Sequence, residues 1–250
     1  MLFDSQHILY MVISGVITAA IFVLCSLFLK DERKKEWVLK ISALATVAIH
    51  YSDLWVDYFS TQGQSYISNT HILLMYPCNV MMWFLFIAAF IKDKKSIGFA
   101  IVADFVFYVG VICSVLGIVL NINYANNPNL ADYSILKGMV SHSTMLIGCL
   151  YMIIGKYVKI GPQNAINVTL GLLSFVICGV FENWIFDVFG MTSPDGMFIK
   201  SNPYIPVSPI ILGIPVVFIM FGILLLCDLR HKKEDRWLSQ VKNFFAGLKK

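Results

Sequence analysis

The sequence predicts an all-α, polytopic membrane helical bundle of seven spans, and three observations carry this prediction. First, 58% of the residues are hydrophobic and only 14% are charged, with a mean hydropathy of +0.74, whereas a soluble domain carries roughly 25% charged residues. Second, the chain contains seven apolar stretches of about the 20 residues that a membrane helix needs. Third, the basic residues lie in alternate loops. Backbone groups in a bilayer need internal partners, so the spans are expected to be helices.

The predicted spans follow one another without a long linker. The first lacks a basic region before it, so we interpret it as a retained span rather than a cleaved signal peptide. The spans are Ile8–Leu29, Trp37–Phe59, Thr70–Ile91, Ile97–Leu120, Tyr133–Ile154, Ala165–Phe189 and Val207–Leu226.

The distribution of positive charge predicts the orientation. Every Lys and Arg except Lys137 and Lys200 lies after the first, third or fifth span or in the C-terminal tail. The positive-inside rule then places the N-terminus outside and the C-terminus inside, which agrees with an odd number of spans. The formal net charge of +4 is not a nucleic-acid signature, and the expected surroundings are membrane lipids in a multi-pass protein.

Two parts are predicted: a seven-helix transmembrane domain at residues 1–229 and a cytoplasmic tail at residues 230–250. The tail places Trp237, Val241, Phe244, Phe245 and Leu248 at helical spacing. This pattern is typical of an amphipathic helix at the membrane interface, and a solvated tail is the alternative. The six cysteines lie in or beside spans without metal-ligand spacing, so neither a disulfide framework nor a metal site is expected.

Three chemically capable residues are predicted to lie at one depth in the membrane. At about 1.5 Å per residue, His50, Cys78 and His142 lie roughly 12 to 13 Å below the outer ends of their spans. Ionisable groups in hydrocarbon usually face the bundle interior and often mark function. Depth alone does not select Cys78, because Cys113 and Cys178 lie at similar levels.

The second and third spans each carry a polar face. His50, Asp53 and Asp57 are spaced to share one side of a helix, either as an Asp-oriented histidine in a cavity or as a buried pair that braces helices. His71 and Cys78 also share a face. Pro77 before Cys78 is predicted to bend the third span and to leave the carbonyl of Leu73 without its usual donor.

The later spans add further candidates. His142 lies between two serines in the fifth span, and a histidine close to a cysteine can take the thiol proton. Glu182 and Asn183 lie in the outer third of the sixth span, and Asp104 lies in the inner part of the fourth. Each of these residues could equally have a purely structural role as an interhelical hydrogen-bond partner.

Three segments resemble a known family. The stretch HILLMYPCNV resembles the Pro-Cys-bearing third span of YwaF-type bacterial integral membrane proteins. The stretch SHSTMLIGCLYMI resembles the histidine-bearing span of that family, and ENWIFDVFGMTSPDGMFIKSNPYIPVSP resembles its last outer loop. The eukaryotic relatives carry a Pro-Cys-His version and are regarded as acyltransferases that remodel ether phospholipids. This chain departs from that version at Asn79.

The resemblance implies a bacterial cell-membrane protein with Cys78 as the acyl-accepting nucleophile and His142 as its base. We therefore expect an acyltransferase that works through a thioester and needs no cofactor. The residues expected to contact substrate are His50, Asp53, His71, Asn79, Glu182 and Asn183. Two alternatives stay open: a small-solute or proton-coupled transporter that uses His50, Asp53, His142 and Glu182, and a non-catalytic membrane scaffold.

Overall fold

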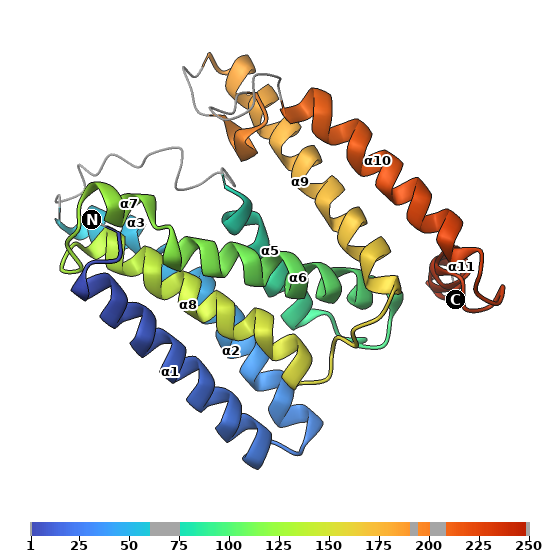
Figure 1. The fold of residues 1–250 in the computed structure, drawn as a ribbon, viewed down its shortest axis with the longest axis horizontal. Helices are drawn as coiled ribbons and strands as arrows, with labels where there is room; N and C mark the ends of the chain where they lie inside the picture. Colours follow the sequence, from blue (N-terminus) through green and yellow to red (C-terminus); the bar gives the residue numbers. More distant parts are fainter. Residues whose placement is uncertain (1, 61–75, 191–194, 201–208, 249–250) are drawn as a thin grey trace.

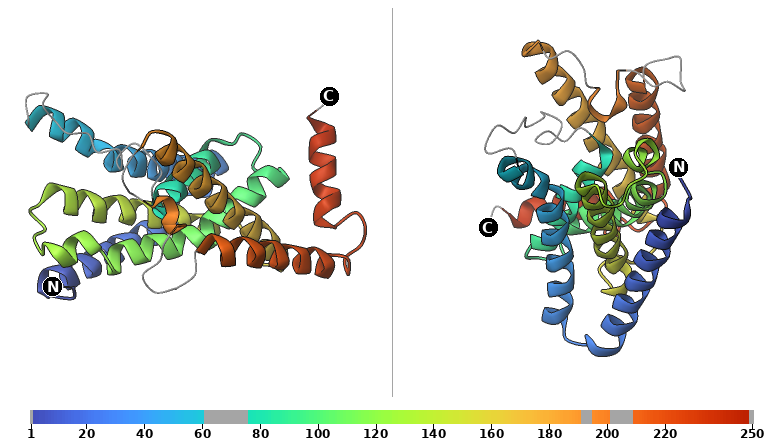
Figure 2. Two further views of the ribbon diagram at one scale, coloured as in Figure 1. Left: turned by 90° about the horizontal axis from the view of Figure 1, so that it is seen from above. Right: turned by 90° about the vertical axis from the view of Figure 1, so that its left-hand side faces the viewer.

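The computed structural model describes residues 2–60, 76–190, 195–200 and 209–248. In these ranges every regular element is a helix, as predicted. Most of the long helices run in broadly the same direction, and the last helix lies across them at the C-terminal end (Figures 1 and 2). The elements are α1 (Ser5–Phe28), α2 (Glu32–His50), α3 (Ser52–Ser60), α5 (Pro77–Phe90), α6 (Ile97–Val119), α7 (Ile122–Asn126), α8 (Tyr133–Ile154), α9 (Gln163–Val188), the 3-10 helix η1 (Gly196–Phe198), α10 (Pro209–Asp228) and α11 (Trp237–Gly247).

Several helices begin at a polar residue whose side chain accepts a backbone N–H of the first turn. Asp4 accepts from the N–H of His7 at 3.0 Å, and Asp31 accepts from that of Arg33 at 2.8 Å. Ser96 caps α6 and Asp132 caps α8 in the same way. Such caps satisfy donors that have no partner inside the helix, so these short polar residues set where the predicted spans begin.

Long apolar helices confirm the membrane class. In the described part of the chain α1, α6 with its continuation α7, α8 and α9 are each long and apolar enough to cross a bilayer, and α5 and α10 are shorter apolar helices. On α1, Leu9, Val16 and Leu24 are each more than half exposed. Lipid tails rather than water suit such a surface. The count of seven spans and the orientation stay predictions.

The predicted bend at Pro77 is wrong. Tyr76 is extended, with φ −119° and ψ 150°, and Pro77 occupies the first position of α5 instead of the interior of a longer helix. The residue before a proline disfavours the helical conformation, and proline tolerates the first turn, where its missing N–H would be unsatisfied anyway. Cys78 and Asn79 therefore lie in the first turn of α5. Leu73 lies outside the described residues.

The second predicted span consists of two helices. α2 ends at His50, and α3 begins at Ser52 after the turn at Tyr51. The prediction that His50, Asp53 and Asp57 share one helix face assumed a single continuous helix. Because the helix is interrupted at Tyr51, their sequence spacing does not place His50 on the same face as the two aspartates. The side chains of both aspartates lie outside the described part of the structure.

The core forms where α2, α5, α6 and α8 meet (Figure 1). Met81, Leu85, Phe105 and Met145 are almost completely buried there. A Cβ on Gly171 of α9 would lie 2.2 Å from the ring of Phe105, so glycine permits the close approach of α9 to α6. Small residues at membrane-helix contacts commonly serve this purpose.

The tail helix α11 is fastened to the bundle by a buried tryptophan. The indole N–H of Trp237 donates to Asn167 Oδ1 at 2.7 Å, and Asn167 donates through Nδ2 to Asp104 Oδ2 at 2.6 Å. The backbone N–H of Trp237 donates to Asp228 at 2.8 Å. Asp104 thus takes the interhelical hydrogen-bond role that the sequence left open. Leu238 on α11 is 57% exposed, and its contact with a membrane interface stays a prediction.

Replacing Trp237 with alanine is expected to release α11. The change removes a large buried side chain, for which about 3–5 kcal/mol is typical, and it leaves the Asn167 oxygen without the indole donor. Limited trypsin digestion at the basic residues before α11 should become much faster in the variant. Leu238→Ala is the matched control, and equal cleavage of both variants would contradict the anchoring role.

Candidate active site

Side chains of three helices line a small cavity in the part of the bundle where α2, α5 and α8 meet. Its volume is about 10 Å³, which is room for about one water molecule. The residues that line it are Thr46 and His50 of α2, Cys78, Asn79 and Met82 of α5, and Ser141, His142 and Met145 of α8. Residues from three separate predicted spans therefore meet at one place.

His142 is held in a defined orientation. Its Nδ1 lies 2.7 Å from the carbonyl oxygen of Gly138. A carbonyl only accepts, so we assign the proton of the neutral ring to Nδ1, which leaves a lone pair on Nε2. A Cβ on Gly117 of α6 would lie 2.0 Å from Cδ2 and 2.3 Å from Nε2 of His142. The ring therefore depends on a glycine at this position of α6.

Cys78 lies in the first turn of α5, where the helix dipole favours negative charge. The N–H groups of Asn79 and Val80 in this turn donate to the carbonyl of Tyr76. The Sγ of Cys78 donates to Asn79 Oδ1 at 3.4 Å. Among the hydrogen bonds of the described residues none joins Cys78 to His142; the two side chains share the cavity instead. Catalytic hydrogen bonds are often long in a protein without substrate, so this arrangement is compatible with proton transfer directly or through one water.

The rest of the lining consists of His50, the hydroxyl groups of Thr46 and Ser141, and two methionines. The rings of His50 and Tyr51 meet edge to face, with centroids 5.1 Å apart. The hydroxyl of Thr46 donates to that of Thr144 at 3.0 Å and joins α2 to α8. Thr46 was not among the predicted site residues, although it precedes His50 by one helical turn and so lies on the same face of the helix. Nothing in the sequence around Gly117 indicates that it belongs to the site, because glycine has no side chain that could take part in chemistry.

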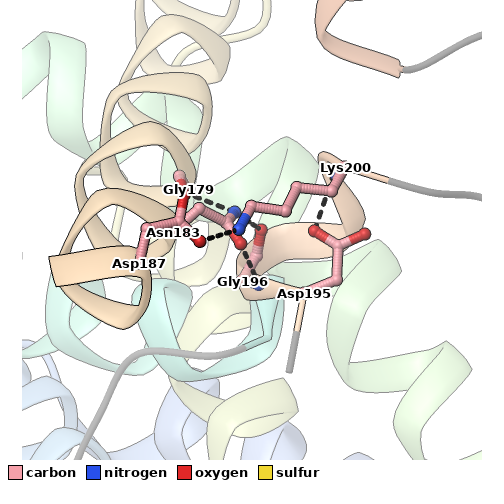
Figure 3. A network of polar contacts seen from close by, with 6 residues as sticks. All are labelled: Gly179, Asn183, Asp187, Asp195, Gly196 and Lys200. Atoms are coloured by element: carbon pink, nitrogen blue, oxygen red, sulfur yellow. Dashed lines mark hydrogen bonds and ion pairs between the residues drawn. The ribbon is translucent and has the colours of Figure 1, made fainter. Parts of the chain in front are cut away.

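Asn183 lies in a different cluster on α9 (Figure 3), and Glu182 directly precedes it in the same helix. The side-chain amide of Asn183 donates to the carbonyls of Gly179 and Gly196 at 2.8 and 3.0 Å, and its oxygen accepts from the N–H of Gly196 at 3.3 Å. The buried Glu182 side chain packs beside Gly196. These two residues fasten the segment 195–200 to α9 and are not among the residues that line the cavity.

Ion pairing reinforces the same attachment. Lys200 Nζ lies 2.6 Å from Asp187, and its backbone N–H donates to Asp195 at 2.7 Å (Figure 3). Of the other predicted contact residues, His71 and the side chain of Asp53 lie outside the described residues. Within the described residues no three His, Cys, Asp or Glu side chains gather closely enough to hold a metal ion.

A bundle of long apolar helices with large exposed apolar surfaces defines a multi-pass α-helical membrane protein. Residues 2–229 match the TMEM164 family, and the chain belongs to this family. No curated protein and no solved structure matches the chain. The family match confirms a membrane protein family, while the YwaF-type name and the bacterial origin stay predictions.

Proposed function

We propose that this protein is a membrane-embedded acyltransferase that moves acyl chains between phospholipids through a thioester on Cys78. The observation that carries the proposal is the shared cavity of Cys78 and His142, which come from α5 and α8. The segments around the two residues also resemble a family whose eukaryotic relatives are regarded as phospholipid acyltransferases. The thiolate is the nucleophilic form of cysteine, so the reaction needs a base beside Cys78.

In the first step His142 Nε2 takes the thiol proton, and Sγ attacks the ester carbonyl of a donor phospholipid. The bond between the acyl carbon and the ester oxygen breaks as the C–S bond forms. The departing alkoxide takes the proton back from His142 and leaves as a lysophospholipid. The products are a neutral lysolipid and an acyl thioester on Cys78.

In the second step the hydroxyl of an acceptor lysolipid gives its proton to His142 Nε2 and attacks the thioester. The C–S bond breaks, and Sγ recovers the proton from His142. The result is a new phospholipid ester and the original thiol. The donor phospholipid and the acceptor lysolipid are thus the only reactants that the two steps require. Holding two groups close in the right geometry supplies much of the rate in such transfers.

The developing oxyanion needs donors in both steps. Asn79 Oδ1 accepts a hydrogen bond from the Cys78 thiol. The NH₂ group of the same side chain is therefore a candidate donor beside the reacting atoms. The backbone N–H of Cys78 itself also lies at the start of α5, whereas the N–H groups of Asn79 and Val80 donate to the carbonyl of Tyr76. Donors of this kind contribute strongly to acyl transfer in a site that excludes water. Asn79 therefore takes an oxyanion-stabilising role in the proposal, and His50 forms part of the wall.

The transporter alternative is less well supported. It requires His50, His142 and Glu182 along one polar path, whereas Glu182 packs against segment 195–200 and does not line the cavity. The cavity that His50 and His142 share is also small, with a volume of about 10 Å³. If no thioester forms on Cys78, the non-catalytic scaffold becomes the better supported alternative.

Trapping the thioester tests the proposal. The purified protein in nanodiscs is incubated with phosphatidylethanolamine whose acyl chain carries a terminal alkyne, then denatured and coupled to a reporter. We expect a label that neutral hydroxylamine removes and that mass spectrometry assigns to Cys78. The Cys113→Ala variant should keep the label, and His142→Gln should acquire it far more slowly. Labelling that persists in Cys78→Ala would contradict the proposal.

A further inference from the structure

A second, larger cavity lies at the end of the bundle where α1 ends, α2 begins and α8 ends (Figure 1). Its volume is about 370 Å³, and it shares no lining residue with the cavity of Cys78. It is lined by Cys25, Ser26, Leu29, Lys30, Lys35, Tyr151, Ile154 and Lys156. We call it the basic cavity.

Three lysines give the basic cavity its charge. Lys30 follows α1, Lys35 lies in the first part of α2, and Lys156 follows α8. The side chain of Lys35 is only 14% exposed, and its Nζ lies 2.5 Å from Glu32 Oε1, whose side chain is 78% exposed. Glu32 pairs with Lys35, and the residues that line the cavity include three lysines and no Asp or Glu, so the lining itself is positively charged.

Lys156 occupies a backbone conformation that favours glycine. Its φ is +61°, in the left-handed region that commonly follows a helix and usually holds glycine or asparagine. Two hydrogen bonds close this turn: the N–H of Gly155 donates to Tyr151 at 2.7 Å, and the N–H of Val158 donates to Met152 at 2.9 Å. The chain therefore places a lysine at the cavity where a smaller residue would be less strained, and a glycine there would leave the turn intact.

The composition of the walls indicates the kind of ligand. Leu29 and Ile154 offer apolar contact, while Ser26 and Tyr151 carry hydroxyl groups. Lysine is a common phosphate-binding residue. Basic pockets between membrane helices on the cytoplasmic side bind anionic lipid headgroups, and the charge distribution predicts that this end of the bundle is cytoplasmic.

We propose that the basic cavity binds the phosphate of an anionic lipid headgroup, with Lys30, Lys35 and Lys156 as its ligands and Leu29 and Ile154 beside the acyl chains. A soluble phosphate compound offers the same chemistry, so the test includes both sources. The proposal is independent of acyl transfer at Cys78, because the two cavities are separate.

Native mass spectrometry of the full-length protein in phosphatidylcholine nanodiscs tests the site. Phosphatidylglycerol is titrated in one arm and inorganic phosphate in the other. The cavity variant carries Lys30→Gln, Lys35→Gln and Lys156→Gly, and the control variant removes the same charge from exposed lysines of the same end by Lys34→Gln, Lys95→Gln and Lys159→Gln. We expect the cavity variant to bind phosphatidylglycerol about tenfold or more weakly, while the control keeps the wild-type affinity.

The outcomes separate the possibilities. Saturable binding of inorganic phosphate that the cavity variant alone loses would support the phosphate site and assign it to a soluble ligand. An equal loss in the cavity and control variants would overturn the proposal, because attraction to the basic end in general would then explain the binding. Unchanged affinity in a cavity variant with wild-type helix content would overturn it as well.

Discussion

Replacing Cys78 with alanine is expected to abolish acyl exchange between phospholipids, because Cys78 supplies the one thiol among the described residues that line the cavity. His142→Gln should lower the rate by about 10²–10⁴-fold, the usual contribution of a positioned base. The measurement is lipidomics of cells that express each protein at equal level, with acyl-chain composition resolved for each phospholipid class.

The neighbouring thiol of Cys113 supplies the matched control. It is half-buried, does not line the cavity and lies at a similar predicted depth, so Cys113→Ala should preserve the wild-type lipid profile. Identical acyl-chain profiles for wild type, Cys78→Ala and His142→Gln would rule out acyl transfer and leave a scaffold role.

Replacing Gly117 with alanine is expected to reduce acyl transfer by about 10²-fold or more, because a small displacement of a catalytic group can have that effect. The new methyl group would lie 2.0 Å from Cδ2 of His142, so the imidazole has to leave its position and its hydrogen bond to Gly138. Overpacking of this kind also destabilises a protein by about 1–3 kcal/mol. Activity is therefore measured together with thermal unfolding.

Two comparisons separate positioning from general destabilisation. Gly138→Ala lies one turn from His142 on α8, and its added Cβ would meet only Asn121 Nδ2 at 3.9 Å. This control should keep both activity and stability, since alanine also favours the helix over glycine. Adding Gly117→Ala to His142→Gln should lower activity little further, because both changes remove the same base. Additive losses would contradict a role through His142.

Helix positions followed from the sequence because they depend on local features. Apolar length and polar caps define a membrane helix almost independently of its neighbours, and α8 has the predicted bounds Tyr133–Ile154. The fourth predicted span, Ile97–Leu120, differs from α6 by one residue. The errors occurred at Tyr51 and Pro77, where an apolar run continues although the helix does not. Hydropathy averaged over a span is insensitive to such interruptions, because the average depends on composition and not on where the backbone leaves the helical conformation.

The sequence alone determined the all-α membrane class, the positions of most helices and a short set of polar residues in the spans, because composition, spacing and capping act over a few residues. The tertiary structure decided which of these residues meet. His50, Cys78, Asn79 and His142 share a cavity, while Glu182 and Asn183 attach the segment 195–200 to α9. That division depends on how each helix is rotated and how closely it packs, and close packing depends on residues such as Gly117 whose role exists only in contact with another helix.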